Sequence, residues 1–273
     1  LSVLLGTLYP LILDSLDLGK ISVGAPYFNA VFIPIMIPAV LLLALVPFMR
    51  WKKDNVARIT SLLRVEWIVV LAFLFVARMT IIDNYYVLLA VGIFSWIVLH
   101  ASSLLIKRLR NKKRMSFSFL GMFLAHIGIG VFILGATITS QLGIEKDLKM
   151  NSGDSLLIAG YNFVFNGVSR HEKDNYRGFR GDLTVFKDNK EVVRLFPEKR
   201  YYQTGMPMTE AAIDPSLTRD LYVALGESLG GGAWSVRIYY KPMIRWVWLG
   251  GILIALGALL SVIDRRYKFK VDS

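Results

Sequence analysis

Several runs of apolar residues in this chain are long enough to cross a lipid bilayer, and this feature decides its fold class. A helix needs about 20 consecutive apolar residues to cross the hydrocarbon core. The mean hydropathy of +0.50 is also too high for an ordinary soluble domain. We therefore predict a polytopic α-helical membrane protein whose complete spans are Val31–Met49, Trp67–Ile82, Tyr85–Ile106, Phe117–Ile138 and Val247–Ile263.

The net charge of +12 is distributed along the chain in a way that indicates membrane topology. Lys and Arg are concentrated in Arg50–Arg64, in Lys107–Arg114 and in the tail after Ile263, whereas residues 143–243 carry 14 basic and 13 acidic side chains. Excess Lys and Arg in short loops marks the cytoplasmic side. We therefore place these short segments inside and residues 143–243 outside, and we predict no binding of nucleic acid.

The resulting division of the chain has six parts. The stretch "LSVLLGTLYPLI" resembles the exit half of a membrane helix, so we expect the chain to be a fragment or one part of a split protein. The expected parts are the end of a truncated membrane helix (1–13), a periplasmic loop (14–30), four transmembrane helices (31–142), a periplasmic β-domain (143–243), the final transmembrane helix (244–264) and a cytoplasmic tail (265–273).

Residues 143–243 are predicted to form an all-β extracytoplasmic domain inserted before the last span. "DLTVFKDNKEVVRLF" has the pattern of two strands joined by a turn at Asp188 and Asn189. "RDLYVALGE" and "AWSVRIYYKP" have the pattern of two more strands, separated by the glycine-rich "SLGGGA". We expect a sandwich or a small barrel that ends at Pro242.

His126 is the candidate functional residue, because it lies in the apolar stretch "MFLAHIGIGVFILG". It is about ten residues from the start of its span, or roughly 15 Å, which is close to the bilayer midplane. Gly121, Gly128 and Gly135 recur every seven residues and predict close approach of another helix. Gly130 would leave room beside the imidazole. The histidine is therefore either a structural hydrogen-bonding group or an axial haem ligand.

The other two histidines are interpreted as structural. His100 is expected to be a structural histidine near the inner membrane interface. It is not expected to be a second haem ligand, because adjacent helices leave too little room for a porphyrin between them. His171, in "VSRHEKDN", is expected to be a solvated loop residue. The chain has no cysteine, which excludes thiol catalysis, disulfides, Cys-ligated zinc and a covalent thioether haem on this chain.

Five stretches in order resemble the C-terminal half of the CcmF family of cytochrome c maturation haem lyases. They are "GTLYPLILDSLDLGKISVGAPYFN", "MFLAHIGIGVFILG", "FPEKRYY", "MTEAAIDPSLTRDLYVALGE" and "WSVRIYYKPMIRWVWLGG". The resemblance implies haem handling and covalent attachment of haem to apocytochrome c. It also implies an intramembrane b-type haem with His126 as one axial ligand and therefore as an iron ligand.

The resemblance further implies partners and a location. The family's tryptophan-rich haem-handling motif and its other haem-ligating histidines belong to the N-terminal half, so this chain is not expected to be an active holocytochrome c synthase alone. Expected partners are that N-terminal half or a split partner, the haem chaperone CcmE, a CcmH-type subunit, apocytochrome c and membrane lipid. The expected location is the bacterial inner membrane or the mitochondrial inner membrane.

A second functional class is a membrane scaffold or transport-associated subunit in which His126 is structural. A transporter would more often show internal repeats and broken intramembrane helices. Pro34, Pro38 and Pro47 could break the first complete span, but no matching half is found. Haem content distinguishes the two classes.

Overall fold

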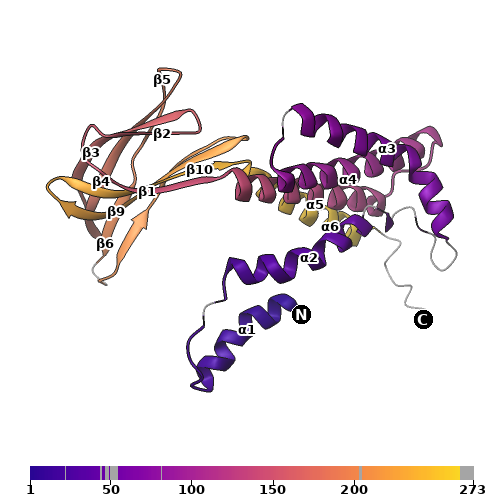
Figure 1. The fold of residues 1–273 in the computed structure, drawn as a ribbon, viewed down its shortest axis with the longest axis horizontal. Coiled ribbons are helices and arrows are strands. Elements are labelled where there is room, and N and C mark those ends of the chain that lie inside the picture. Colours follow the sequence, from indigo (N-terminus) through magenta and orange to yellow (C-terminus); the bar gives the residue numbers. More distant parts are fainter. Residues whose placement is uncertain are drawn as a thin grey trace. The chain divides into compact units, whose positions relative to one another are not determined.

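The computed structural model describes residues 1–21, 23–43, 45–46, 49, 55–80, 82–202 and 205–264 (Figure 1). Its helices are α1 (Ser2–Ser15), α2 (Ala25–Leu43), α3 (Val56–Thr80), α4 (Tyr85–Arg110), α5 (Phe117–Leu142) and α6 (Ile244–Ile263). The chain divides into two compact units. The first contains Leu1–Ile81, Val91–Ile127 and Gly257–Ser273, and the second contains Ile82–Ala90 and Gly128–Leu256.

Four helices in the described part of the chain are long and apolar enough to cross a membrane. They are Pro26–Leu43 within α2, all of α4, all of α5 and all of α6. The predicted span Trp67–Ile82 falls in α3, where the apolar helical stretch is the shorter Trp67–Met79. That fifth span therefore stays a prediction. The basic residues Arg50–Lys53 and the tail 265–273 lie outside the described residues.

Helix α2 begins six residues before the predicted span and continues through Pro34 and Pro38. The two prolines therefore do not divide this helix, although each removes one backbone N–H donor. Membrane helices tolerate proline where the freed carbonyls find other partners. The predicted break at Pro47 lies outside the described residues. An unbroken α2 lacks the discontinuous geometry that is typical of transporter binding sites.

Residues 144–242 form a β-sandwich of two antiparallel sheets. One sheet has the order β1-β10-β9-β8, formed by Ile144–Met150, Ala233–Pro242, Arg219–Gly230 and Ala212–Pro215. The other has the order β2-β3-β4-β6-β7, formed by Ser155–Ile158, Tyr161–Lys173, Tyr176–Lys187, Glu198–Tyr202 and Pro207–Glu210. Strand β5 (Lys190–Leu195) also pairs with β4.

The core of the sandwich lies between the two sheets. Alternate residues of the long strands face inward, as the period of two requires. Phe163 on β3 and Val185 on β4 are register partners and are completely buried. Leu221, Val223 and Leu225 on β9 supply the facing apolar surface. The predicted all-β domain is therefore confirmed, and it is a sandwich rather than a barrel.

Two predicted turns join strands as expected. Asp188 and Asn189 connect β4 to β5 with φ angles of 50° and 59°, and Lys187 pairs with Lys190 across them. Positive φ at both central residues is the geometry of a type I′ hairpin turn, which Asn and Asp tolerate. Gly231 and Gly232 form the corresponding turn between β9 and β10.

Candidate functional site

Helix α5, which carries His126, packs closely against α6 at its glycines. In the first unit, a Cβ on Gly121 would lie 2.4 Å from the carbonyl oxygen of Gly257. In the second unit, a Cβ on Gly128 would lie 2.8 Å from the carbonyl oxygen of Gly250. These distances are too short for any side chain, so the glycines are required for this contact. The predicted role of the glycine stripe is confirmed, and its partner is α6.

A buried carboxylate fixes the start of α5 in the first unit. Asp264, which directly follows α6, is 6% exposed, and its Oδ2 accepts a hydrogen bond of 2.8 Å from the backbone N–H of Ser118. Ser116 Oγ accepts a second bond from the N–H of Phe119. Negative charge is favourable at a helix N-terminus, where backbone N–H groups have no helical acceptor. Asp264 therefore holds α5 in register with the end of α6.

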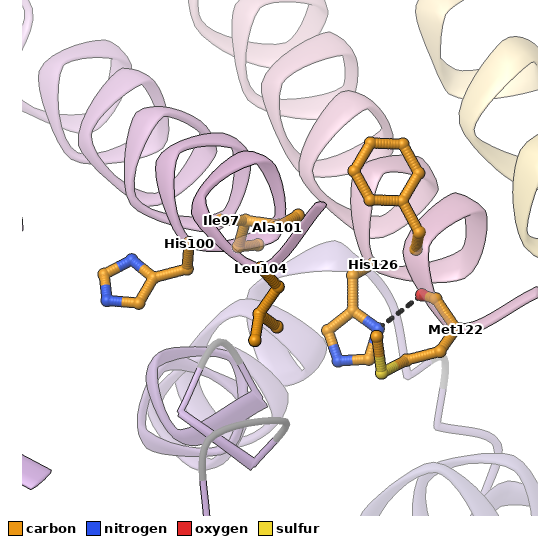
Figure 2. A pocket seen from close by; sticks show the side chains of 7 residues that line it. Ile97, His100, Ala101, Leu104, Met122 and His126 are labelled. Carbon is orange, nitrogen blue, oxygen red and sulfur yellow. Dashed lines mark hydrogen bonds between the residues drawn. The ribbon is translucent and has the colours of Figure 1, made fainter. Parts of the chain in front are cut away.

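The imidazole of His126 is oriented by its own helix. Nδ1 lies 2.7 Å from the carbonyl oxygen of Met122, one turn earlier (Figure 2). Because a carbonyl can only accept, Nδ1 carries a proton, and in this tautomer of the neutral imidazole Nε2 has the lone pair. Among the residues that the structure describes, the buried Nε2 has no hydrogen-bond partner. Metal-bound histidines typically have this arrangement, in which one ring nitrogen is fixed by a hydrogen bond and the other is a free donor.

The space around His126 is much smaller than a porphyrin. A cavity of about 10 Å³ lies between α4 and α5 in the first unit. This volume holds about one water molecule. Its lining is almost entirely apolar and consists of Ile97, His100, Ala101, Leu104, Met122, Phe123 and His126 (Figure 2). The donor atom therefore fits an iron ligand, but a haem at Nε2 requires the surrounding side chains to separate.

His100 lies on the same cavity but has different surroundings. Its Nδ1 is 2.8 Å from the carbonyl oxygen of Trp96, and its ring packs against the Trp96 indole at a tilt of 51°, with centroids 3.9 Å apart. Trp96 in turn packs against Trp67 of α3, with centroids 3.9 Å apart and a tilt of 42°. The imidazoles of His100 and His126 do not face each other (Figure 2). His100 is therefore part of an aromatic cluster and does not form a facing pair with His126.

Gly130 lies one turn after His126 on α5 and is buried. Its predicted role beside a haem stays a prediction. Across the described residues, no group of three or more His, Cys, Asp or Glu side chains is arranged to hold a metal ion.

The prediction for His171 is wrong, because the residue lies on a strand. It belongs to β3, its side chain is 25% exposed, and its Nε2 is 3.6 Å from Glu198 Oε1. Glu198 also accepts a hydrogen bond of 2.8 Å from Arg200 and one of 3.2 Å from the Tyr176 hydroxyl. The long strand β3 continues past Val168, where the apolar alternation ends. The apolar alternation therefore predicted a strand shorter than β3 is.

The electrostatics of this cluster favour an ionised Glu198. Burial of the carboxyl raises its pKa, but the hydrogen bond and charge of Arg200, together with His171 and Tyr176, outweigh that effect. The net pKa of Glu198 lies below its ordinary value. Charge pairing of this kind stabilises a sandwich face, and none of its members was singled out by the sequence as functional.

Residues 141–242 match a family model described as the CcmF C-terminal beta-sandwich. The chain is 43% identical to the cytochrome c-type biogenesis protein CcmF of Pseudomonas aeruginosa, over 99% of this chain and 42% of that protein. It is 42% identical to the Escherichia coli CcmF, over 100% of this chain and 42% of that protein.

This chain matches the C-terminal part of CcmF. A solved structure of the cytochrome c haem lyase CcmF has the same fold, with a TM-score of 0.77 and 19% identity over 96% of this chain and 43% of the other. The resemblance to CcmF and the membrane fold with an inserted β-domain are confirmed. The chain spans 42% of the length of these curated relatives.

Sequence reasoning missed Asp264 and Glu198. The signal for Asp264 was the position of a carboxylate directly after the last apolar run, at the depth where α5 begins. For Glu198 the signal was the charged string "PEKRYY", which is part of one of the stretches that resemble CcmF. The contacts of Glu198 with His171 and Tyr176, however, depend on how β3 and β4 pair. Asp264 bonds to Ser118, and Glu198 contacts His171 and Tyr176 as well as its sequence neighbour Arg200. Local patterns could not assign the partners that are distant in the sequence.

Proposed function

We propose that this chain forms the C-terminal part of a cytochrome c haem lyase. In this role it takes part in haem handling and in covalent attachment of haem to apocytochrome c. His126 contributes one axial ligand to an intramembrane b-type haem, and the N-terminal half supplies the remaining ligand and most of the pocket. The names of the relatives support a role in cytochrome c biogenesis, and the chemistry of His126 supports its role as a haem ligand.

One observation carries the ligand proposal. The buried Nε2 of His126 has no hydrogen-bond partner among the described residues, while Nδ1 is held by the Met122 carbonyl. An unsatisfied polar atom in an apolar membrane helix is costly, on the order of 1–3 kcal/mol. Coordination of an iron would satisfy it. A haem bound there supplies one-electron chemistry at iron, and the chain contributes the donor atom, its tautomer and its orientation.

The small cavity at His126 supports a shared pocket. Because about 10 Å³ cannot hold a porphyrin, the haem would occupy space that opens only when the chain is joined to its other half. This chain alone is therefore expected to bind little haem and to be inactive. The haem chaperone CcmE, a CcmH-type subunit and apocytochrome c are the partners that this function requires.

The test is to co-express this chain with its N-terminal half and to measure haem by a pyridine haemochrome assay and a reduced-minus-oxidised spectrum. We expect His126→Ala to lose most of the b-type haem or to shift its spectrum, because the iron loses a ligand. Added imidazole should restore part of the original spectrum, since it replaces the missing ring. A purely structural histidine would not respond to imidazole in this way.

His100→Ala is the matched control. His100 lines the same cavity, and its Nδ1 bonds to the carbonyl four residues earlier in the same way. We expect this variant to retain the spectrum as long as the two halves still copurify. If His126→Ala copurifies with the N-terminal half and keeps an unchanged haem content and spectrum, the ligand proposal is wrong and His126 is a structural group.

A further inference from the structure

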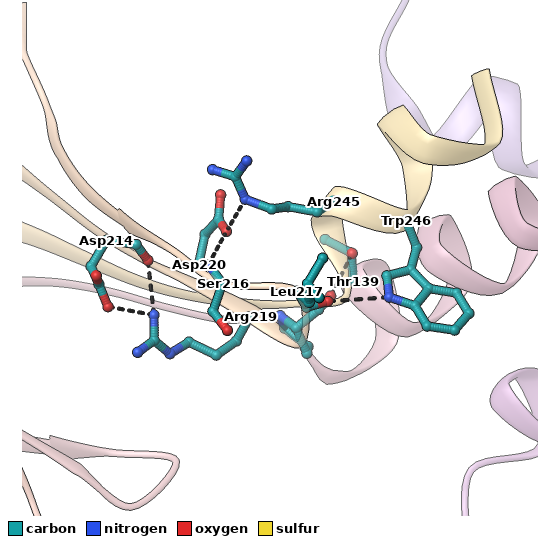
Figure 3. Close-up of polar contacts among 9 residues, drawn as sticks. Thr139, Asp214, Ser216, Leu217, Arg219, Asp220, Arg245 and Trp246 are labelled. Carbon is teal, nitrogen blue, oxygen red and sulfur yellow. Dashed lines mark hydrogen bonds and ion pairs between the residues drawn. The ribbon is translucent and has the colours of Figure 1, made fainter. Parts of the chain in front are cut away.

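The turn between β8 and β9 is fixed to the first turn of α6, entirely within the second unit (Figure 3). The Trp246 indole donates a hydrogen bond of 3.1 Å to the carbonyl oxygen of Leu217. The backbone N–H of Met243 donates one of 2.9 Å to the carbonyl oxygen of Thr218. These two bonds place the tip of the turn beside the entrance of a helix that is long and apolar enough to cross the membrane.

The side chain at the tip of this turn is apolar and faces away from the protein. Leu217 is 76% exposed, the highest exposure among the large apolar side chains of the turn and its flanking strands. An isolated exposed leucine is common on protein surfaces. Here, however, the residue lies next to Trp246, at the boundary between a membrane span and the sandwich. Tryptophan is enriched at this level because its ring is amphipathic.

The charges around the turn are paired. Arg219 is 9% exposed and forms an ion pair with Asp214 in the same hairpin. Asp220 forms an ion pair of 3.1 Å with Arg245 of α6 (Figure 3). The two carbonyls at the tip accept hydrogen bonds from Met243, directly before α6, and from Trp246 within α6. The N–H of Ser216 donates to the carbonyl oxygen of Arg219 at 2.8 Å. Paired charges and satisfied backbone groups are what a loop needs in order to enter a poorly hydrated layer.

We propose that Leu217 inserts into the interfacial layer of the bilayer and forms a third membrane contact of the β-sandwich, beside the covalent connections through α5 and α6. The partner is the phospholipid layer in which α6 begins, at the level of the glycerol backbone and the first acyl carbons. This proposal depends on the membrane fold and is independent of haem binding. Its consequence is that the sandwich is attached to the membrane by a loop in addition to its two connecting helices, which limits its tilting.

The test uses the absence of native cysteines. Leu217→Cys is labelled with an environment-sensitive nitrobenzoxadiazole probe in the chain co-expressed with its N-terminal half. The complex is placed in nanodiscs of phosphatidylethanolamine and phosphatidylglycerol, with or without lipids that carry a quencher near the headgroup. The substitution leaves the turn intact, because Leu217 bonds to Trp246 through its backbone oxygen.

Leu229→Cys is the matched control, because Leu229 is also exposed, at 51%, and lies near the opposite end of β9. Ten residues of extended strand separate it from Arg219, which is about 33 Å. We expect the lipid quencher to reduce the fluorescence at position 217 several-fold more than at 229. Equal accessibility of both probes to aqueous iodide would overturn the proposal. Protection of position 217 from both quenchers would also overturn it, because a protein surface would then cover this residue.

Discussion

At the scale of single residues, His126 and His100 differ in their surroundings and not in their backbone bond. Each imidazole bonds to the carbonyl four residues earlier, at 2.7 Å and 2.8 Å. The His100 ring packs against Trp96 of the same helix, whereas His126 lines a small apolar cavity and has, among the described residues, no aromatic ring contact of this kind. The apolar run around His126 was sufficient to select it from the sequence. Trp96 in turn contacts Trp67 of α3, and this part of the environment of His100 could not be predicted from α4 alone.

The ion pairs of Glu198 lead to a pH dependence of sandwich stability. Because the pKa of Glu198 in the folded protein lies below its ordinary value of 4.5, its stabilising contribution is complete above that pH. The contribution is lost as the pH falls from there through the lowered pKa. We expect Glu198→Gln to lower the free energy of unfolding at pH 7 by about 1–3 kcal/mol, and we expect this difference to shrink below pH 4.5.

The measurement is denaturant unfolding of the sandwich in the detergent-solubilised complex, monitored by tryptophan fluorescence between pH 3 and pH 7. Glu191→Gln on β5 is the control, because Glu191 is exposed and should change stability by less than about 0.5 kcal/mol. If the free energy of unfolding lost in Glu198→Gln stays constant down to pH 3, the charge of Glu198 contributes nothing to the stability of the sandwich.

At the scale of elements, the contact between α5 and α6 depends on glycine backbones. A Cβ on Gly250 would lie 2.6 Å from the N atom of Phe132 and 2.7 Å from the carbonyl oxygen of Gly128. Gly251, the next residue on α6, has no atom within 4 Å of the same position. We expect Gly250→Ala to separate the two helices locally and to cost about 1–3 kcal/mol, measured as a lower Tm of the solubilised protein.

Gly251→Ala tests this interpretation with the same chemical change. Alanine has a higher helix propensity than glycine, so this variant should be neutral or slightly more stable. Equal Tm losses in the two variants would indicate that helix α6 needs flexible backbone and not close contact. The seven-residue spacing of glycines on α5 predicted a close neighbour, but it could not identify that neighbour as α6.

The sandwich shows how far local patterns predict a fold. The strand alternation and the Asp188–Asn189 turn were sufficient to predict β4, β5, β9 and β10, because hairpin pairing is local. The sheet orders were not predictable, since β10 also pairs with β1, from Met150 opposite Trp234 to Ile144 opposite Tyr240, across more than 80 residues of chain. The same limitation applies to the contact of the β8–β9 turn with Trp246, which arises only when the sheet is complete.

At the scale of the whole molecule, the distribution of charge predicts which sides of the membrane the two ends of α5 occupy. The loop before α5 contains Lys112, Lys113 and Arg114, whereas the segment after it is the nearly neutral sandwich. Since α5 is long and apolar enough to cross the membrane once, we expect these two regions to lie on opposite sides. Positively charged short loops are retained in the cytoplasm, so we expect the sandwich to be periplasmic and the loop to be cytoplasmic.

Single cysteines in this cysteine-free chain test that topology. Asp174→Cys lies in the turn between β3 and β4, and Lys113→Cys lies in the basic loop; both positions are exposed. In cells with a permeabilised outer membrane, a membrane-impermeant maleimide should label position 174 at once and position 113 only after the inner membrane is lysed. The reverse order would place the sandwich in the cytoplasm. It would then be on the wrong side to meet an apocytochrome in the periplasm, and the proposed haem lyase function would fail with it.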